Sequence, residues 1–242
     1  TVVSFDLRGQ GENLPPASRA VTCGYQDLVD DVGAVVDLVQ ASFPKAPVYL
    51  VGHSLGGQLA LLYAAAEPSR VHGVVLVAAG SVWFRSFRGV PAFRTLIGTQ
   101  VVSVLSRLLG FWPGDRLGFG GRQPRGVMRD WARQARSGQY VLSGATTDYE
   151  AALRTLRSPV LAVSVEGDHL APQSAVDHLS GKAVQAVRTR RHYTRADSGA
   201  DKLGHFAWVR SGHQLAAWIG EWVSAQFGSA QEAHDAEVGR VR

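Results

Sequence analysis

One serine stands in a setting that suits nucleophilic chemistry. Residues 52–56 read Gly-His-Ser-Leu-Gly, which fits the G-x-S-x-G pattern of a nucleophile elbow. An apolar run precedes this pentapeptide and a helix-like pattern follows it, so Ser54 is expected on a sharp strand-to-helix turn with its hydroxyl exposed. Gly52 and Gly56 are expected because side chains there would collide with the turn. A serine that only caps the helix is the alternative, and the preceding strand argues against it.

A nucleophilic serine needs a base, an acid and an oxyanion donor. The backbone N–H of Leu55, at the helix N-terminus, is one expected donor. In sites of this kind the chain order is serine, acid, histidine. Asp168 follows an apolar run and is the predicted acid, whereas Glu166 lies nearer the strand end and is expected to point away. His205, just before the last helical segment, is the predicted base.

The other histidines are weaker candidates for the base. His53 is next to the nucleophile in sequence and is expected to point elsewhere, although it belongs to the elbow. Two more are predicted on loops, His169 and His192. The remaining ones are predicted at the surface, at element ends or on helices: His72, His178, His213 and His234.

The pattern around these residues alternates between strands and helices, which predicts a mostly parallel sheet with helices on both faces. The apolar runs predict strands at Thr1–Phe5, Val48–Val51, Gly73–Ala79, Val160–Val165 and Ala183–Arg188. Apolar residues at three- and four-residue steps predict helices at Tyr25–Phe43, Leu55–Ala66, Gln173–Leu179 and His213–Phe227. Gly228–Arg242 is polar and patternless, and we expect a frayed tail there.

The stretch from Ser81 to Glu150 has a different texture, with ten arginines against four acidic residues. It predicts helices around Leu96–Leu109 and Gly126–Arg136 and no convincing strand. We interpret it as a helical cap (81–150) inserted into a core formed by 1–80 and 151–227, over the carboxyl ends of the strands. Its aromatic residues either line an apolar acyl pocket or pack the cap's own core: Trp83, Phe84, Phe87, Phe111, Trp112 and Trp131.

Composition narrows the classes of function. The chain has 242 residues, 45% hydrophobic and 19% charged, and no apolar run long enough to span a membrane. A single cysteine, Cys23, excludes an internal disulfide and a cysteine metal cluster. The net charge of +5 comes from dispersed arginines without a nucleic-acid motif, so no nucleic-acid partner is expected. No signal-peptide pattern follows Thr1, but a targeting signal upstream of Thr1 would not be visible in this sequence. The compartment is therefore unknown, with the cytoplasm favoured.

Taken together, these residues carry a family resemblance. The sequence resembles the α/β-hydrolase superfamily, near its serine aminopeptidase-like and monoacylglycerol lipase-like branch, through residues 6–11, 52–57, 167–168 and 204–206. Residues 109–120 and 124–127 are also similar to uncharacterised bacterial predicted hydrolases. The resemblance implies an α/β-hydrolase fold with an inserted cap.

One departure from the family concerns the start of the chain. In this superfamily the Asp-x-Arg-Gly-x-Gly segment, here residues 6–11, follows the fourth strand of the sheet. The resemblance therefore implies that three strands are lacking, together with the loop that supplies a second oxyanion donor. We expect such a chain to be inactive and not independently stable, because an internal strand of the sheet would be missing.

The sequence thus predicts a serine hydrolase that cleaves a carboxylic ester, acting as an esterase or lipase through an acyl-enzyme. Amide, peptide or thioester hydrolysis and acyl transfer stay open as alternatives, as does a non-catalytic hydrolase-like binding protein. We expect a small-molecule acyl substrate and neither metal nor organic cofactor. The arginine excess of the cap fits an anionic substrate or an acidic lipid surface, and it fits an ordinary solvated surface equally well. The oligomeric state cannot be inferred from these patterns.

Overall fold

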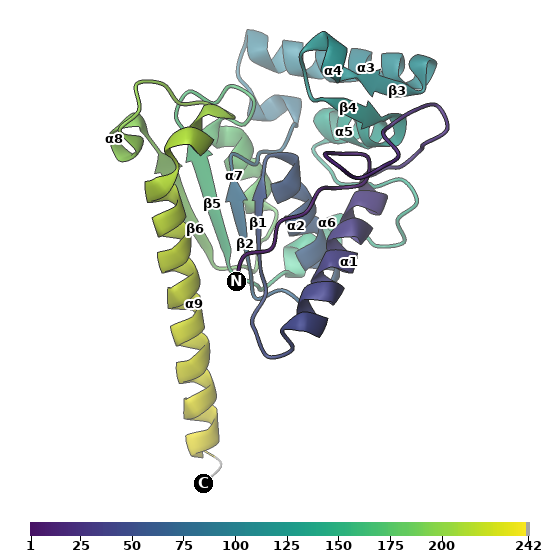
Figure 1. Ribbon diagram of the computed structural model, residues 1–242. Helices are drawn as coiled ribbons and strands as arrows, with labels where there is room; N and C mark the ends of the chain where they lie inside the picture. The colour runs from purple at the N-terminus through teal and green to yellow at the C-terminus, as the bar shows by residue number, and fades with distance from the viewer. Residues whose placement is uncertain (241–242) are drawn as a thin grey trace.

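A parallel four-stranded sheet forms the centre of the molecule in the order β1-β2-β5-β6 (Figure 1). The computed structural model describes the backbone of residues 1–240 and the side chains of residues 1–226. The strands are β1 (Tyr49–His53), β2 (Gly73–Val77), β5 (Val160–Val165) and β6 (Arg188–Tyr193). Every residue of β2 and β5 is buried, as continuous apolar runs require when helices cover both faces of a sheet.

Two hydrophobic clusters lie on opposite faces of this sheet. Val74 and Leu76 of β2 belong to one cluster, and Val75 and Val77 to the other, following the two-residue period of a strand. The first face is covered by α1 (Tyr25–Ser42), α2 (Leu55–Ala66), α6 (Tyr149–Thr155) and α7 (Gln173–Gly181). The second is covered by α9 (His213–Arg240), near which lies the short α8 (Arg195–Ser198).

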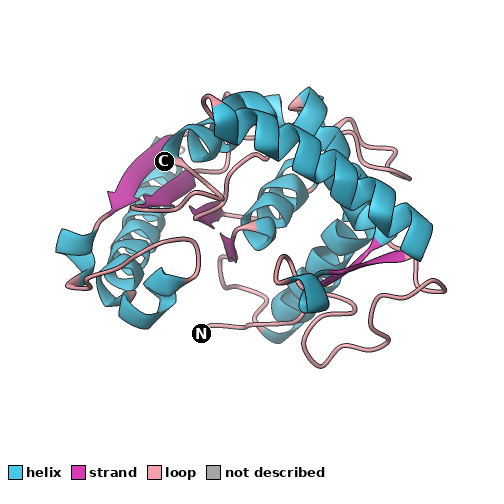
Figure 2. Cartoon of the chain, turned by 90° about the horizontal axis from the view of Figure 1, so that it is seen from above, coloured by secondary structure: helices cyan, strands magenta, loops and turns pink. Residues whose placement is uncertain are grey.

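The cap region follows β2 and lies at the end of the sheet where the strands finish (Figures 1 and 2). Its long helix α3 packs against α5 and against a small antiparallel hairpin, β3–β4. The elements of the region are the 3₁₀ turn η1 (Phe84–Ser86), α3 (Val90–Leu109), β3 (Phe111–Pro113), α4 (Gly114–Leu117), β4 (Arg122–Pro124) and α5 (Arg125–Ser137). A second 3₁₀ turn, η2 (Ala207–Ser211), precedes α9.

Several predicted elements match the structure closely. The helix Leu55–Ala66 and the strand Val160–Val165 have the predicted bounds, and α1 ends one residue before its predicted end. The cap helices are also confirmed, with α3 beginning at Val90 instead of near Leu96. The final helix continues past Phe227 to Arg240, where we expected a tail, and residues 241 and 242 lie outside the described residues.

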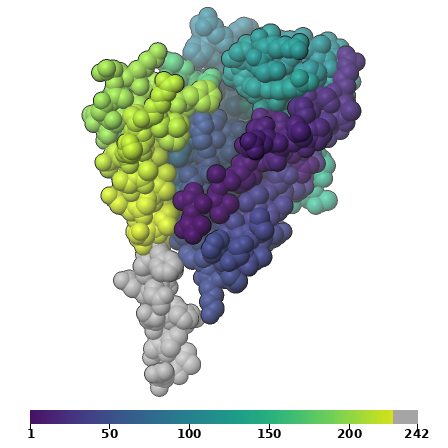
Figure 3. All heavy atoms as spheres, viewed as in Figure 1, coloured from purple at the N-terminus to yellow at the C-terminus, as the bar shows by residue number. Residues whose placement is uncertain are grey.

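Three predictions about strands are wrong. Residues 1–6 form no strand and are exposed, and in Figure 3 they run along the outside of the molecule. An apolar run becomes a strand only when it has a partner, and none pairs with it in the described part of the chain. The strand predicted at Ala183–Arg188 lies instead at β6, which is an edge strand rich in arginine. The hairpin β3–β4 in the cap was not predicted at all.

A buried carboxylate joins the cap to the core. Asp130 of α5 accepts hydrogen bonds from the backbone N–H of Tyr25 (3.2 Å), which begins α1, and from the Ser143 hydroxyl (2.6 Å). Asp130 also accepts a hydrogen bond from the backbone N–H of Ser143, at 3.4 Å. Because all three donors point at one buried side chain, Asp130 fixes α5 against α1.

We expect Asp130→Ala to lower the free energy of unfolding by about 3 kcal/mol, because it leaves the buried N–H of Tyr25 and the part-buried donors of Ser143 without an acceptor. Denaturant unfolding of this variant against the unmodified protein measures the loss. Asp115→Ala is the matched control, since Asp115 is exposed and should change stability by less than about 0.5 kcal/mol. Equal losses in the two variants would show that Asp130 does not hold the cap.

Candidate active site

Ser54 lies on the turn between β1 and α2 in a strained backbone conformation. Its φ of 52° and ψ of −118° fall where residues other than glycine are rarely found. The turn is held by a hydrogen bond from the Ser54 N–H to the Val77 carbonyl at 3.1 Å. Ser54 occupies the N-cap position of α2, but its side chain makes no capping hydrogen bond, so the alternative that this serine only caps the helix is wrong.

The tight packing of this turn requires glycine at two positions. A Cβ on Gly52 would lie 2.3 Å from the backbone of Gly56 and Gly57. The prediction that Gly56 is equally necessary is wrong, because a Cβ there would meet nothing within 4 Å. Gly57 is the second required glycine: its Cβ would lie 2.5 Å from the Cβ of Ala79 and 2.8 Å from the Gly52 carbonyl. The crowding comes from α2 passing over the ends of β1 and β2.

Three predicted side chains form one hydrogen-bonded series. The Ser54 Oγ lies 2.8 Å from Nε2 of His205, and Nδ1 of His205 lies 2.8 Å from Oδ2 of Asp168. The Asp168 carboxylate is fully buried and the His205 side chain is only 8% exposed. The other carboxylate oxygen of Asp168 accepts the backbone N–H groups of Leu170 and Ala171, both at 2.9 Å. The Asp168 carboxylate is therefore held in one orientation.

The competing acid is engaged elsewhere. Glu166 forms an ion pair with Arg195 (2.7 Å) and also accepts the Arg195 backbone N–H (2.8 Å). The hydrogen bond from that backbone N–H is the main reason why the pKa of Glu166 is lowered. As predicted, Glu166 points away from the site. His169 is exposed on a loop, as predicted. The loop prediction for His192 is wrong: it lies in β6, with its Nδ1 2.9 Å from the Ser164 hydroxyl.

His53 contacts His205, the predicted base, so the prediction that His53 points elsewhere is wrong. Its Nε2 lies 2.8 Å from the backbone carbonyl of His205, and the two imidazole rings are 4.8 Å apart. The rings of Phe206 and Trp208 each lie 5.6 Å from His53. Burial is the main cause of its lowered pKa, so the neutral form is favoured. A carbonyl can only accept, hence Nε2 carries the proton and His53 holds the loop that presents His205.

This contact predicts different behaviour for two substitutions of His53. His53→Phe keeps the ring packing but removes the donor, and we expect the kcat of an activated ester to fall about fivefold to tenfold, with little change in KM. His53→Gln retains an N–H donor and should recover most of the rate. Steady-state kinetics measures both variants. Equal rates for them would argue that the hydrogen bond does not position His205.

The predicted oxyanion donor, the backbone N–H of Leu55, lies at the N-terminus of α2. The N–H of Leu55 donates no hydrogen bond within the described part of the chain, which leaves it available to a ligand. Twelve residues of α2 place the positive end of the helix dipole at the same point. A negative charge that develops on an atom beside Ser54 would be stabilised there.

The aromatic residues predicted for an acyl pocket are spread over several parts of the molecule. The Trp83 ring packs on His178 of α7 at 4.5 Å, while Phe84 is in η1 and Phe87 directly follows it. In the hairpin, Trp112 donates to the Phe119 carbonyl (2.8 Å). Arg122 lies 4.1 Å over Phe111, and Trp131 of α5 is 6.0 Å from Phe119. Phe111, Trp112 and Trp131 thus pack within the cap. That any of the six predicted residues lines an acyl pocket stays a prediction.

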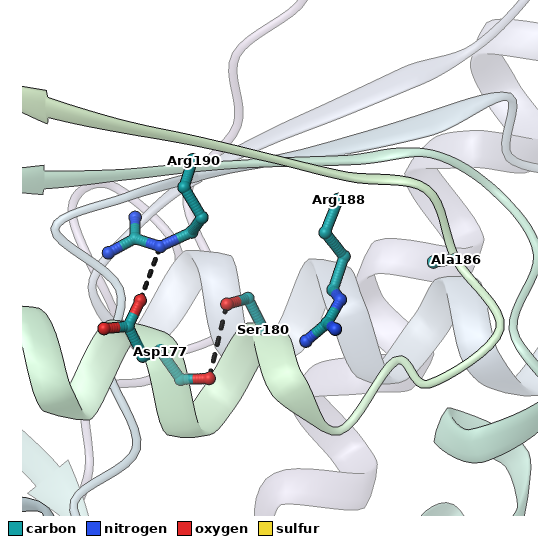
Figure 4. Close-up of a pocket in the computed structure, with 5 residues that line it drawn as sticks. All are labelled: Asp177, Ser180, Ala186, Arg188 and Arg190. Carbon is teal, nitrogen blue, oxygen red and sulfur yellow. Dashed lines mark hydrogen bonds and ion pairs between the residues drawn. The ribbon is translucent and has the colours of Figure 1, made fainter.

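A hollow of about 350 Å³ lies between α7 and β6 (Figure 4). Its floor carries an ion pair between Arg190 and Asp177 at 2.5 Å. It is lined by Asp177, Ser180, Ala186, Arg188 and Arg190. Since β6 and β1 are opposite edges of the sheet, this hollow does not serve Ser54.

Comparison with known proteins places the chain in a family. A model described as the alpha/beta hydrolase family matches residues 1–218. The monoglyceride lipase of Mus musculus is 37% identical over 76 residues, which cover 31% of this chain. An uncharacterised Mycobacterium tuberculosis protein is 34% identical over 82 residues, covering 34% of the chain. These matches span only 24% and 22% of the lengths of those two relatives.

Solved structures show the same fold at low sequence identity. A monoacylglycerol lipase from Paleococcus ferrophilus has a TM-score of 0.59 at 15% identity, covering 92% of this chain and 82% of that one. A thermophilic esterase from Thermogutta terrifontis has a TM-score of 0.56 at 16% identity, covering 91% and 78%. With a fold shared with lipases and esterases and a family match over most of its length, the chain belongs to the alpha/beta hydrolase family.

Proposed function

We propose that the protein is a serine hydrolase that cleaves a carboxylic ester through an acyl-enzyme. The observation that carries the proposal is the hydrogen-bonded series from Ser54 through His205 to Asp168, with 2.8 Å at each step. A serine, a histidine and a buried carboxylate in this geometry are the parts that acyl transfer requires. Support for an ester comes from the similarity of part of this chain to a monoglyceride lipase, and from a fold that it shares with an esterase.

The proposed mechanism starts from a neutral His205 beside an ionised Asp168. An ionised carboxylate only accepts, so Nδ1 of His205 donates to Asp168, and Nε2 presents its lone pair to the Ser54 hydroxyl. His205 can then accept the serine proton while Oγ attacks the carbonyl carbon. The buried negative charge of Asp168 stabilises the imidazolium that forms.

The remaining steps follow from the same three groups. The carbonyl oxygen becomes negative in the tetrahedral intermediate, where the N–H of Leu55 donates to it. His205 returns its proton to the leaving alcohol, the C–O bond breaks, and an acyl group remains on Ser54. Water then attacks the acyl carbon while His205 accepts its proton, and collapse of the second intermediate returns the proton to Oγ and releases the carboxylic acid.

The proposal is tested on the full-length protein with a fluorophosphonate probe and two chromogenic substrates. We expect the probe to label Ser54, and p-nitrophenyl butyrate to be turned over faster than an aminoacyl p-nitroanilide. Ser54→Ala should abolish labelling and turnover. Labelling at another serine would refute the assigned nucleophile, and faster cleavage of the anilide would make the enzyme a peptidase. Absence of both labelling and turnover in a folded protein would favour a binding protein.

A further inference from the structure

Helix α3 of the cap exposes a row of apolar side chains, whereas an ordinary surface helix buries such a row against the core. Six apolar side chains recur along it at three- and four-residue steps, and each is between 45% and 68% exposed: Val90, Phe93, Ile97, Val101, Val104 and Leu108. Residues at these steps lie on one face of a helix. Exposed apolar residues are ordinary when scattered, but a continuous stripe over 20 residues indicates a surface that contacts something.

The buried face of α3 is small and partly polar. Thr99 and Ser106 are buried, and their hydroxyls donate to the backbone carbonyls of Leu96 (2.9 Å) and Val102 (2.6 Å) in the same helix. Their hydroxyl groups are therefore satisfied inside the helix, and α3 packs against α5. Packing within the chain thus leaves the larger apolar side chains of this helix outside.

The surroundings of the stripe carry positive charge. No Asp or Glu occurs between Glu67 and Asp115, whereas Arg94 and Arg107 lie on α3 itself and Arg88 just precedes it. Two further exposed arginines reach the helix from elsewhere: Arg19 donates to the Leu108 carbonyl (3.5 Å) and Arg136 to the Gln100 side chain (3.1 Å). The stripe is consequently apolar at its centre and cationic at its sides.

We propose that α3 is a lipid-contact helix that docks the cap on an anionic membrane surface. A helix with an apolar face and arginines beside that face is of the kind that lies in the headgroup region of a bilayer. Pairing with a second copy would bring the arginines of two α3 helices together with no acid from this stretch to neutralise them. Since α3 lies across the outer side of the cap (Figure 2), docking would turn the end of the sheet that carries Ser54 toward the lipid.

The test measures binding of the full-length protein to vesicles without any substrate, so it is independent of the proposed esterase activity. We expect flotation with phosphatidylglycerol vesicles, little with phosphatidylcholine vesicles, and loss of binding on raising the salt concentration. Arg94→Gln with Arg107→Gln should weaken binding at low salt by about 25-fold, as each arginine contributes about fivefold. Val101→Glu with Leu108→Glu should abolish it.

Val184→Glu with Val187→Glu is the matched control, because these two exposed valines lie on the loop before β6, away from the cap. This double variant should bind vesicles like the unmodified protein, and all the variants should keep its unfolding midpoint. Equal binding to both kinds of vesicle, or binding unaffected by the α3 substitutions, would overturn the proposal. So would a concentration-dependent dimer that the Val101 and Leu108 substitutions dissociate, seen by sedimentation without vesicle binding.

Discussion

Asp168→Asn is expected to reduce ester turnover roughly 10⁴-fold while leaving the fold intact. The side-chain oxygen of the asparagine can still accept the N–H groups of Leu170 and Ala171, which places its NH₂ against Nδ1 of His205. His205 must then present a protonated Nε2 to Ser54 and cannot accept the serine proton. The kcat of p-nitrophenyl butyrate hydrolysis and the rate of fluorophosphonate labelling should fall together, because both depend on the same base.

Glu166→Gln is the control for this substitution. It removes one exposed ion pair with Arg195 two residues from Asp168, and it should change the rate by less than about twofold. The opposite pattern, a large loss in Glu166→Gln and near-full activity in Asp168→Asn, would transfer the acid role to Glu166. Thermal unfolding of both variants separates a loss of catalysis from a loss of folded protein.

The second large effect concerns the adjacent glycines Gly56 and Gly57, where substitution by alanine should change the free energy of unfolding in different ways. Gly57→Ala brings a Cβ to 2.5 Å from Ala79 and 2.8 Å from the Gly52 carbonyl, so α2 must move away from the strand ends. We expect a loss of about 3 kcal/mol or more in the free energy of unfolding, together with a displaced Ser54. Gly56→Ala meets open space and should leave stability unchanged or raise it by up to about 1 kcal/mol, through helix propensity.

Denaturant unfolding of the two variants measures this difference directly. The substitutions are chemically identical and occupy neighbouring positions in the first turn of α2, so each controls for the other. A destabilised Gly56→Ala with an unaffected Gly57→Ala would mean that α2 sits differently on β1 and β2. Fluorophosphonate labelling then reports whether the elbow still presents Ser54 when the helix has shifted.

The sequence predicted the parts of the fold in which local pattern and tertiary environment agree. The all-apolar run Val160–Val165 is buried on both faces, and Leu55–Ala66 begins at a serine turn and ends before a proline, so both have the predicted bounds. It also placed Ser54, Asp168 and His205 at loops that the fold brings together. The order of these residues along the chain, and their positions after strands, were enough to predict that they lie together, because parallel strands end at the same edge of the sheet.

Features that depend on partners distant in sequence were not predictable in this way. Strand β6 reads as a charged loop, yet Arg190 pairs with Asp177 of α7 and Arg191 lies over Trp218 of α9. His53 was set aside because its contact is with the backbone of His205, which has no sequence signal. Which glycine of the elbow is indispensable likewise depends on how closely α2 approaches the strands.

The hydrogen bond between Ser54 and His205 also has a consequence for folding. It joins residues 151 positions apart, whereas Asp168 and His205 are 37 apart. Closing so long a loop costs chain entropy that only the docked sheet and cap region can offset, so this contact forms late. A collapsed or misfolded chain would hold Ser54 without its base. The reactivity of Ser54 therefore reports whether the segment that carries Ser54 has docked against the segment that carries His205.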